Sequence, residues 1–267
     1  MGELDGKTAI VTGGGRGIGK AIAEAYVNAG ARVVVTAARE FAEIQSVAQA
    51  AGPERALALQ ADVTDARACE QVVAQTLARF QRVDVLVNNA GRGMKYVSPH
   101  FMTEPTRFWE IDPETWRMII ATNVDGPFFM SRAVLPVMLA QGAGSIISIT
   151  MNYETMKRKG FSPYGPSKAA LESASIIWAQ ELEGTGVRLN LLLPGGATDT
   201  GMIPTEFPVG LRDRLLPAHI VAAPAIYLAS DASRHLNGRR ITATEWSPDH
   251  PDGRPADQGI GPTTPPF

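Results

Sequence analysis

The chain has 267 residues, of which 25 are Lys or Arg, 27 are Asp or Glu, and 45% are apolar. This apolar fraction can build a full core and the length suits one α/β domain, so global disorder is excluded. A net charge of −2 gives no reason to expect nucleic acid or an anionic membrane as a partner. The single cysteine, Cys69, excludes an internal disulfide framework and a cysteine-built metal site, and we expect no metal ion.

Apolar runs and longer stretches of helical periodicity alternate between residues 8 and 243, which predicts an α/β fold with a parallel sheet and helices on both faces. The expected strands are residues 8–11, 32–36, 56–60, 83–87, 145–150, 187–193 and 240–243. Helical periodicity starts at Ile18 and marks residues 69–80, 164–182 and 220–230 as further helices. Another long helix is expected to begin with a capping Asp112 and a first-turn Pro113, to bend at Pro127 and to stop near Gly142.

The two ends of the chain carry separate expectations. The N-terminus is charged where a signal peptide needs an apolar run, and nowhere do roughly 18 apolar residues follow one another, so we expect a cytoplasmic protein that does not span a membrane. Residues 1–246 read as one domain without a linker. Residues 247–267 hold six prolines and three glycines, a composition that forms neither a helix nor an interior strand. This tail is expected to lie extended on the surface or on another subunit, or to be disordered.

The segment from Thr12 to Gly19 places five glycines between the first strand and the first helix. Glycines let the backbone approach a pyrophosphate closely, and a helix N-terminus supplies free N–H groups and a positive dipole. A plain tight turn would also use glycines, but the strand–turn–helix context favours a dinucleotide site.

Further motifs follow along the chain. Asn-Asn-Ala-Gly at residues 88–91 follows the fourth strand, Asn123 lies in the long helix, Tyr164 and Lys168 open the next helix, and Pro194-Gly195 ends the sixth strand. In this order and spacing the motifs resemble the short-chain dehydrogenase/reductase superfamily over residues 5–243. The resemblance implies a single-domain Rossmann-type fold, a nicotinamide cofactor and a small-molecule substrate. It also implies a homotetramer or homodimer in which the long helices pack across a two-fold axis.

The resemblance assigns roles to individual residues. Tyr164 would act as general acid/base with the help of Lys168, and Asn123 would hold a water that links Lys168 to solvent. Asp62 matches the position that hydrogen-bonds the adenine, although Asp62 can also be read as the cap of the next helix. The residues expected at the cofactor are Gly13, Gly15, Arg16, Gly17, Ile18, Gly19, Arg39, Asp62, Val63, Asn89, Ala90, Gly91, Tyr164, Lys168, Pro194 and Gly195.

Tyr164 and Lys168 can also be argued from physical chemistry, since residues four apart share one face of a helix. Moving a tyrosine pKa from about 10 to about 7 needs roughly 4 kcal/mol. A cation about 4 Å away supplies approximately that energy at an effective dielectric constant of about 20. The pair is therefore predicted to donate a proton to a carbonyl or to accept one from an alcohol.

The end of the second strand predicts a preference for NADP(H) over NAD(H). Members that bind NAD place an acidic residue there for the ribose 2′-hydroxyl, whereas this chain reads Val-Thr-Ala-Ala-Arg at residues 35–39 and has its first acid at Glu40. Arg16 and Arg39 can both reach a 2′-phosphate, although each can also be an ordinary surface arginine.

Met151 stands where the family has the serine whose hydroxyl bonds the reacting oxygen. A thioether donates no hydrogen bond, and losing such a donor typically costs about 3 to 4 kcal/mol of transition-state stabilisation. Thr150 or Asn152 can take over if the strand bulges or ends early, and Tyr153 shares the side of Met151 if the strand stays extended. Met151 can also be a plain apolar wall of the substrate pocket, and the sequence leaves these alternatives open.

The predicted activity is an oxidoreductase that interconverts a carbonyl and a secondary alcohol on a small organic molecule. Two alternatives remain, which are reduction of a conjugated C=C bond and cofactor binding with impaired catalysis. Residues 94–108 are longer than the family needs and rich in Met, Tyr, Phe and His, so they are either a lid over the pocket or an inert insertion. Residues 157–159, Lys-Arg-Lys, are either a solvated charge run or a site for an anionic substrate group.

Overall fold

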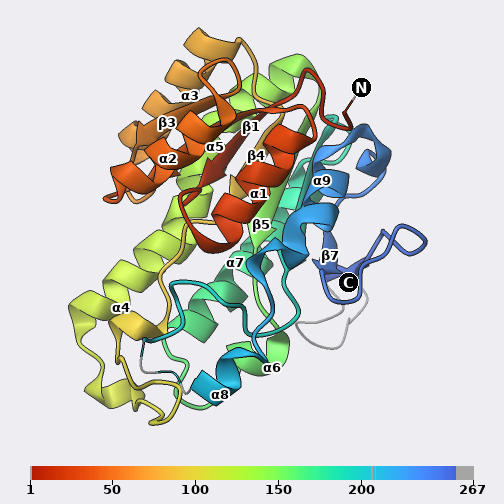
Figure 1. Ribbon diagram of the computed structural model, residues 1–267. Coiled ribbons are helices and arrows are strands. Elements are labelled where there is room, and N and C mark those ends of the chain that lie inside the picture. The colour runs from red at the N-terminus through yellow and green to blue at the C-terminus, as the bar shows by residue number, and fades with distance from the viewer. Residues whose placement is uncertain (1, 206, 208, 257–267) are drawn as a thin grey trace.

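The computed structural model describes residues 2–205, 207 and 209–256. Within them, one sheet of eight strands runs in the order β3-β2-β1-β4-β5-β6-β7-β8 (Figure 1). Strands β1 to β7 are parallel and β8 is antiparallel to β7. The strands are β1 (Thr8–Thr12), β2 (Arg32–Ala37), β3 (Ala56–Gln60), β4 (Val85–Asn88), β5 (Gly144–Ile149), β6 (Val187–Leu193), β7 (Arg239–Thr242) and β8 (Arg254–Pro255). The predicted α/β class with a parallel sheet is confirmed.

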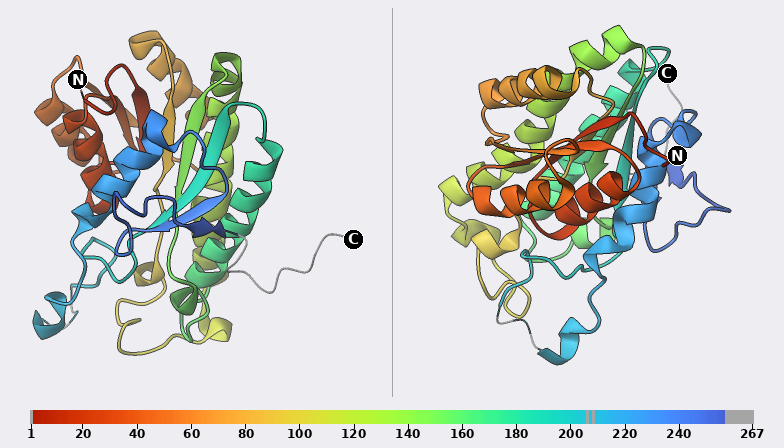
Figure 2. Two further views of the ribbon diagram at one scale, coloured as in Figure 1. Left: turned by 90° about the vertical axis from the view of Figure 1, so that its right-hand side faces the viewer. Right: turned by 45° about the horizontal axis from the view of Figure 1, so that its top comes forward.

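Helices cover both faces of this sheet, as Figure 2 shows in its left-hand view. One face carries α1 (Gly17–Asn28), α2 (Phe41–Ala51) and α9 (Ala222–Ala229), and the other carries α3 (Ala66–Phe80), α5 (Gly126–Gln141) and α7 (Tyr164–Glu181). Along β1, Ala9 and Val11 pack into the first layer and Ile10 into the second. Successive strand residues point to opposite faces, so two covered faces explain the uninterrupted apolar runs.

Among the described residues, no helix combines the length and the apolar composition that a membrane span requires.

The strand order opens a crevice at one end of the sheet. From β1 the chain proceeds to β2 and β3 on one side and then returns to β4 on the other. Such a reversal leaves a ligand-sized gap beyond the carboxyl ends of the two central strands. The short elements α4 (Pro113–Ile120), α6 (Tyr153–Met156) and α8 (Val209–Arg212) lie at that end (Figure 1). The remaining short helices are η1 (Met94–Tyr96), η2 (Phe108–Glu110), η4 (Ala218–Val221) and η5 (Asp231–Ser233).

The long helix expected from residue 112 is interrupted by a π-helical turn. Asp112 caps α4 as predicted, since its Oδ2 accepts a hydrogen bond from the Thr115 N–H at 2.8 Å. The π-helical turn η3 (Ala121–Asp125) then stands where a bend at Pro127 was expected. Pro127 has no N–H for the Asn123 carbonyl, which favours a wider turn at this point. Helix α5 ends at Gly142 with φ 63°, as the glycine predicted.

The C-terminal segment forms an edge rather than an interior strand. Arg254 and Pro255 pair antiparallel with Arg240 and Arg239 of β7. Residues 247–256, the described part of the expected tail, contain no interior strand, as predicted, but Ala256 has 3-10 helical backbone. The tail was expected to be extended or disordered over residues 247–267. Residues 254 and 255 pair with β7 and Ala256 is 1% exposed, so disorder is wrong for this part, and residues 257–267 lie outside the described residues.

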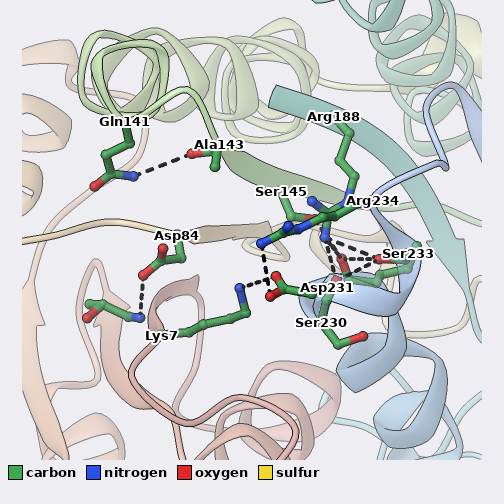
Figure 3. A network of polar contacts seen from close by, with 12 residues as sticks. Lys7, Asp84, Gln141, Ala143, Ser145, Arg188, Ser230, Asp231, Ser233 and Arg234 are labelled. Carbon is green, nitrogen blue, oxygen red and sulfur yellow. Dashed lines mark hydrogen bonds and ion pairs between the residues drawn. The ribbon is translucent and has the colours of Figure 1, made fainter. Parts of the chain in front are cut away.

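A polar network closes the end of the sheet opposite the crevice (Figure 3). Arg188 of β6 is 7% exposed and donates to the carbonyls of Leu228 and Ser230 at 3.0 and 2.8 Å. Burial lowers the pKa of Arg188, and the carbonyls at the end of α9 offset part of the desolvation cost of its charge. Lys7 donates to Asp231 Oδ1 at 2.7 Å nearby. This network joins β6 to α9 and leaves the crevice end free for chemistry.

Candidate active site

A cavity of about 450 Å³ crosses the carboxyl ends of the parallel strands. Its lining follows the strand order, so segments far apart in the sequence share one space. The residues include Asp62 and Val63 after β3, Arg39 after β2, Gly13 and Gly15–Ile18 after β1, Asn89–Gly91 after β4, Met151 after β5, and Pro194 and Gly195 after β6. Tyr164 and Lys168 of α7 line the cavity beside β5 and β6.

Thr12 joins the two central strands at the crevice. Its hydroxyl donates to the Val87 carbonyl at 3.1 Å and accepts from the N–H groups of Asn89 and Ala90, each at 3.0 Å. Gly13 follows with φ 64°, and a Cβ atom there would lie 3.0 Å from the Ala90 Cα. Glycine is therefore required at this close approach. The sequence shows Thr12 only as the first residue of the glycine segment, and its bridging role emerges from the structure.

The start of α1 offers hydrogen-bond donors to the cavity. Arg16 is the N-cap residue without a side-chain cap, and the first turn has no acidic residue. The first N–H groups of the helix therefore need an acceptor from outside it, and an anion such as a pyrophosphate fits there. Of the predicted cofactor residues, Gly19 alone does not line the cavity among the residues that the structure describes. A Cβ atom at Gly19 would lie 2.3 Å from the Gly13 carbonyl oxygen, so its role is to let α1 pack against the loop.

Tyr164 and Lys168 lie one turn apart at the start of α7. Lys168 is 4% exposed and donates to the Ile149 carbonyl at 2.8 Å. Burial lowers the pKa of Lys168 to about 8, while the Glu172 carboxylate opposes this change. Burial raises the pKa of Tyr164 to about 12. The expected fall of the Tyr164 pKa towards 7 is thus not met, because burial of the hydroxyl disfavours the charged phenolate.

Asn123 in the π-helical turn braces the end of β4 against α7. Its side chain is fully buried, and its two amide protons go to the Arg92 carbonyl and the Ser167 hydroxyl, each at 2.9 Å. Its Oδ1 accepts from the Arg92 N–H at 2.8 Å. Both donors are therefore used, so the side chain can hold the expected water only as an acceptor. The water-holding role stays a prediction.

Two roles were considered for Asp62, the cap of the next helix and a contact with adenine, and the first belongs to Asp65. Asp65 caps α3, since its Oδ1 accepts from the N–H groups of Arg67 and Ala68 at 2.9 and 3.4 Å. Asp62 lines the cavity and accepts from the N–H and the hydroxyl of Thr64 at 3.0 and 2.8 Å. The interpretation of Asp62 as the helix cap is wrong, because the cap of α3 is Asp65, three residues further on. Contact with adenine remains a prediction.

Strand β5 ends at Ile149, and this early end brings Thr150, Met151 and Asn152 to the cavity together. The Thr150 hydroxyl donates to Glu172 Oε1 at 2.6 Å, so its proton is already used. One amide proton of Asn152 goes to the Gly195 carbonyl at 2.9 Å. Asn152 keeps a second amide proton, which makes it the remaining candidate for the donor role expected of a serine at position 151.

The Tyr153 side chain lies outside the cavity. It begins α6, so the condition of a continuing extended strand is not met. Its hydroxyl donates to the Ala256 carbonyl at 3.3 Å, and the Arg240 guanidinium carbon lies 4.0 Å from its ring centroid. The described lining of the cavity does not include Tyr153.

Apolar side chains surround Tyr164, and several come from the segment 94–108. Met94, Phe101 and Phe161 are buried and pack with Val97, Met102, Met151 and Tyr164. The Met202 Sδ atom lies 4.0 Å from the Tyr164 hydroxyl oxygen, a neighbour that no sequence signal indicated. The Thr106 hydroxyl donates to the Gly160 carbonyl at 3.1 Å. Because residues 94–96, 101 and 102 line the cavity, this segment forms one of its walls and is not an inert insertion.

The end of β2 brings charges of both signs to the cavity. Arg16 and Arg39 line it as predicted, together with Glu40 and Glu43. Arg16 Nη1 lies 3.3 Å from Glu43 Oε1 in a solvent-exposed ion pair.

Comparison with known proteins agrees with this geometry. Residues 7–208 match the family model described as short chain dehydrogenase. The chain is 35% identical over 253 residues to galactitol 2-dehydrogenase (L-tagatose-forming) of Cereibacter sphaeroides, with 88% of this chain and 92% of the relative covered. It is 33% identical over 250 residues to the 3-oxoacyl-(acyl-carrier-protein) reductase FabG of Salmonella typhimurium, with 90% and 96% covered. A crystal structure of 3-ketoacyl-(acyl-carrier-protein) reductase from Brucella melitensis, complexed with NADH, superimposes with a TM-score of 0.79 at 28% identity and covers 90% of this chain and 97% of that chain.

Proposed function

Because this chain belongs to the short-chain dehydrogenase/reductase superfamily of oxidoreductases, we propose that it interconverts a carbonyl and a secondary alcohol on a small organic molecule with a nicotinamide cofactor. The observation that carries the proposal is one cavity that joins Tyr164 and Lys168 to the uncapped start of α1. One part of this cavity can move a proton, and the other can bind a pyrophosphate.

The lining residues fit a dinucleotide. Residues 15–18 would hold the pyrophosphate, and Asp62 and Val63 would contact the adenosine end. Residues 89–91, Pro194 and Gly195 would border the remainder of the cofactor. When bound, the nicotinamide supplies or accepts the hydride.

The protonation states of Tyr164 and Lys168 suit reduction of a carbonyl. With a pKa of about 12, Tyr164 is protonated at neutral pH and can donate its proton as the carbonyl oxygen gains negative charge. With a pKa of about 8, Lys168 is largely charged at pH 7 and stabilises the phenolate that Tyr164 leaves behind. The second amide proton of Asn152 would hydrogen-bond the reacting oxygen.

We further propose that the preferred cofactor is NADP(H). Arg39 lines the cavity directly after β2, and residues 35–39 contain no acid that would repel a 2′-phosphate. The ion pair between Arg16 and Glu43 is exposed and therefore worth at most about 1 kcal/mol, so Arg16 can exchange Glu43 for a 2′-phosphate. Both arginines would then bind the same group.

The test compares the wild-type protein with Tyr164→Phe. NADPH and NADH affinities are measured by fluorescence titration, and NADPH oxidation is followed over matched panels of ketones and enones. We expect tighter binding of NADPH than of NADH, ketone turnover by the wild type, and a loss of about 100- to 10,000-fold in kcat for Tyr164→Phe, which removes only the acid. The variant should bind NADPH as the wild type does, because the phenyl ring is retained.

Three outcomes would contradict the assignment. Wild-type turnover by Tyr164→Phe would exclude Tyr164 as the acid. Turnover confined to enones would favour reduction of a conjugated C=C bond. Tight NADPH binding without oxidation on any carbonyl would indicate a cofactor-binding protein with impaired catalysis.

A further inference from the structure

The end of the cavity that holds Tyr164 contains a cluster of side chains that donate no hydrogen bond. Met94 is 2% exposed, and Phe101 and Phe161 are 8% exposed, and the three pack with Met151 and Tyr164 in one cluster. Each substrate hydroxyl buried without a partner against these groups would cost about 1–3 kcal/mol. A polyol therefore fits this end poorly, and an apolar body fits it well.

The acidic side chains are confined to one end of the cavity. The strand order sets the residues after β3 and β2 at one end and the residues after β5 and β6 at the other. The acidic residues of the described lining all follow β2 or β3, namely Glu40, Glu43 and Asp62. From β4 onwards all the charged residues of the lining are basic. Besides Lys168 they are Arg92, Lys95 and Arg158.

These three cations lie against aromatic rings. The Arg158 guanidinium carbon lies 5.3 Å from the Phe161 ring centroid, and the Arg92 guanidinium carbon lies 5.4 Å from the Tyr96 centroid. Lys95 Nζ lies 5.6 Å from the Tyr96 centroid and also donates to the Gly201 carbonyl. Within the part of the chain that the structure describes, none of them forms an ion pair with a carboxylate. This end of the cavity thus combines an apolar wall with positive charge available to an anion.

We propose that the substrate is a small apolar or aromatic ketone, or the corresponding alcohol, that carries a carboxylate, and that Arg158 binds this carboxylate. The proposal rests on the carbonyl–alcohol activity proposed above and names its substrate class. A planar guanidinium can bind a carboxylate through two parallel hydrogen bonds, which a lysine cannot do.

Phe161 connects the two halves of this site. Its ring packs edge-to-face on Phe101 with centroids 5.8 Å apart, within the cluster that contains Tyr164. The Arg158 guanidinium lies over the same ring. A molecule whose apolar body lies on this cluster, with its carbonyl at Tyr164, therefore brings a charged group to Arg158. Lys157, Arg158 and Lys159 are all exposed, but Arg158 lines the cavity and the two lysines do not, so the lysines provide matched controls.

The experiment uses a panel of aryl and alkyl ketones, each prepared as the carboxylate and as the primary amide, with benzoylpropionate and its amide as one pair. Steady-state kcat/KM with NADPH is measured for the wild type, Arg158→Ala, Arg158→Lys and Lys159→Ala. We expect the wild type to prefer the carboxylates by about 10- to 100-fold, the range of a charge-assisted hydrogen bond. Arg158→Ala should bring the carboxylate-to-amide ratio close to one, Arg158→Lys should keep part of the ratio, and Lys159→Ala should keep all of it.

Equal turnover of both series by the wild type, or an unchanged ratio in Arg158→Ala, would overturn the carboxylate site and leave the carbonyl–alcohol activity intact. If no ketone of either series is turned over, the proposed activity fails instead. Equilibrium binding to the NADPH-saturated protein then decides the present inference. Carboxylates must bind at least about ten-fold more tightly than amides, and Arg158→Ala must remove the difference; equal binding would overturn the site.

Discussion

Lys168 is a buried cation, and holding it at the active site costs stability. Burial moves its pKa from 10.5 to about 8, and a shift of this size corresponds to about 3 kcal/mol at neutral pH. The hydrogen bond to the Ile149 carbonyl returns part of this energy, and the shift already includes the opposing attraction of the Glu172 carboxylate. The residue that we propose to assist proton transfer is therefore one that stability alone would not favour.

Lys168→Met is expected to abolish turnover and to raise the free energy of unfolding at pH 7 by about 1–2 kcal/mol, the desolvation cost less the lost polar contacts. The folded wild type releases the Lys168 proton near pH 8, while the unfolded chain keeps it to about pH 10. The wild type should therefore gain stability as pH rises through that window, and the variant should lack this gain. Urea unfolding at pH 7 and pH 10 measures both effects. A variant less stable than the wild type at both pH values would contradict this account.

Met151 occupies the position at which we expected the family's serine, and its packing indicates a role for the methionine side chain. It lies in the apolar cluster with Phe101, Phe161 and Tyr164, while its carbonyl accepts a hydrogen bond from Arg240 at 2.7 Å. The Met151 side chain thus forms part of the pocket wall, while the hydrogen bond from Arg240 holds the Met151 backbone whatever its side chain.

Met151→Ser should raise KM for an apolar ketone by about 5- to 30-fold, because it removes about 1–2 kcal/mol of apolar contact, and should change kcat little. Met151→Leu keeps the volume and should keep KM. Steady-state kcat and KM are measured with one ketone for the wild type, Met151→Ser and Met151→Leu. A large rise in kcat at unchanged KM would mean instead that the site lacks a donor and that Asn152 has not replaced it.

At the scale of elements, a buried ion pair ties α7 to β7 and to the loop after β5. Glu172 is fully buried, and its Oε1 accepts from Thr150 at 2.6 Å and from Arg240 Nε at 3.2 Å. Arg240 also donates to the Met151 carbonyl and lies over the Tyr153 ring. One arginine thereby holds the loop that carries Met151.

Arg240→Met is expected to lower the free energy of unfolding by about 3–5 kcal/mol, because it leaves the buried Glu172 charge without its partner. Replacing both residues, Arg240→Met with Glu172→Met, should recover most of this loss, since no charge then remains buried at the pair. Arg254 of β8 forms an exposed pair with Glu245 and serves as the control, for which Arg254→Met should cost under about 1 kcal/mol. Urea unfolding of the wild type, Arg240→Met, Glu172→Met and the double variant tests the cycle, with Arg254→Met as a fifth protein. A double variant as unstable as the sum of its singles would contradict the pairing.

At the scale of the whole molecule, α5 and α7 present an apolar face to solvent. Phe128 is 45% exposed and Ile177 is 51% exposed, and the rings of Phe128 and Trp178 lie 6.1 Å apart. Exposed apolar side chains gathered on two adjacent helices are typical of a subunit interface. We propose that this face is covered by a second copy of the chain across a two-fold axis.

Sedimentation velocity at micromolar concentration should therefore detect a dimer or tetramer rather than the 28.5 kDa chain alone. Phe128→Asp should shift the distribution towards the monomer, because it places a charge in the interface. Phe41→Asp serves as the control, since Phe41 is similarly exposed at 39% but lies on α2. Sedimentation of the wild type as a monomer would exclude the proposed interface.

The sequence by itself determined the α/β class, the positions of most strands and helices, the glycine loop and the shared face of Tyr164 and Lys168. All of these depend on short-range information, because hydrophobic periodicity, capping residues and turn residues act within a few positions along the chain. Asp112 and Gly142 illustrate this, since Asp112 caps the start of α4 and Gly142 caps the end of α5, as their residue types predict.

Only the tertiary structure decided which distant residues meet and in what environment. Arg240 lies 68 positions from Glu172, and Met202 lies 38 positions from Tyr164, yet each pair is in contact. Strand order and loop paths set such contacts, and neither leaves a periodic signal in the sequence. The raised pKa of Tyr164 has the same origin. The lysine four residues away is visible in the sequence, whereas the burial that raises the pKa arises only when the strand ends, the segment 94–108 and α7 come together around the hydroxyl.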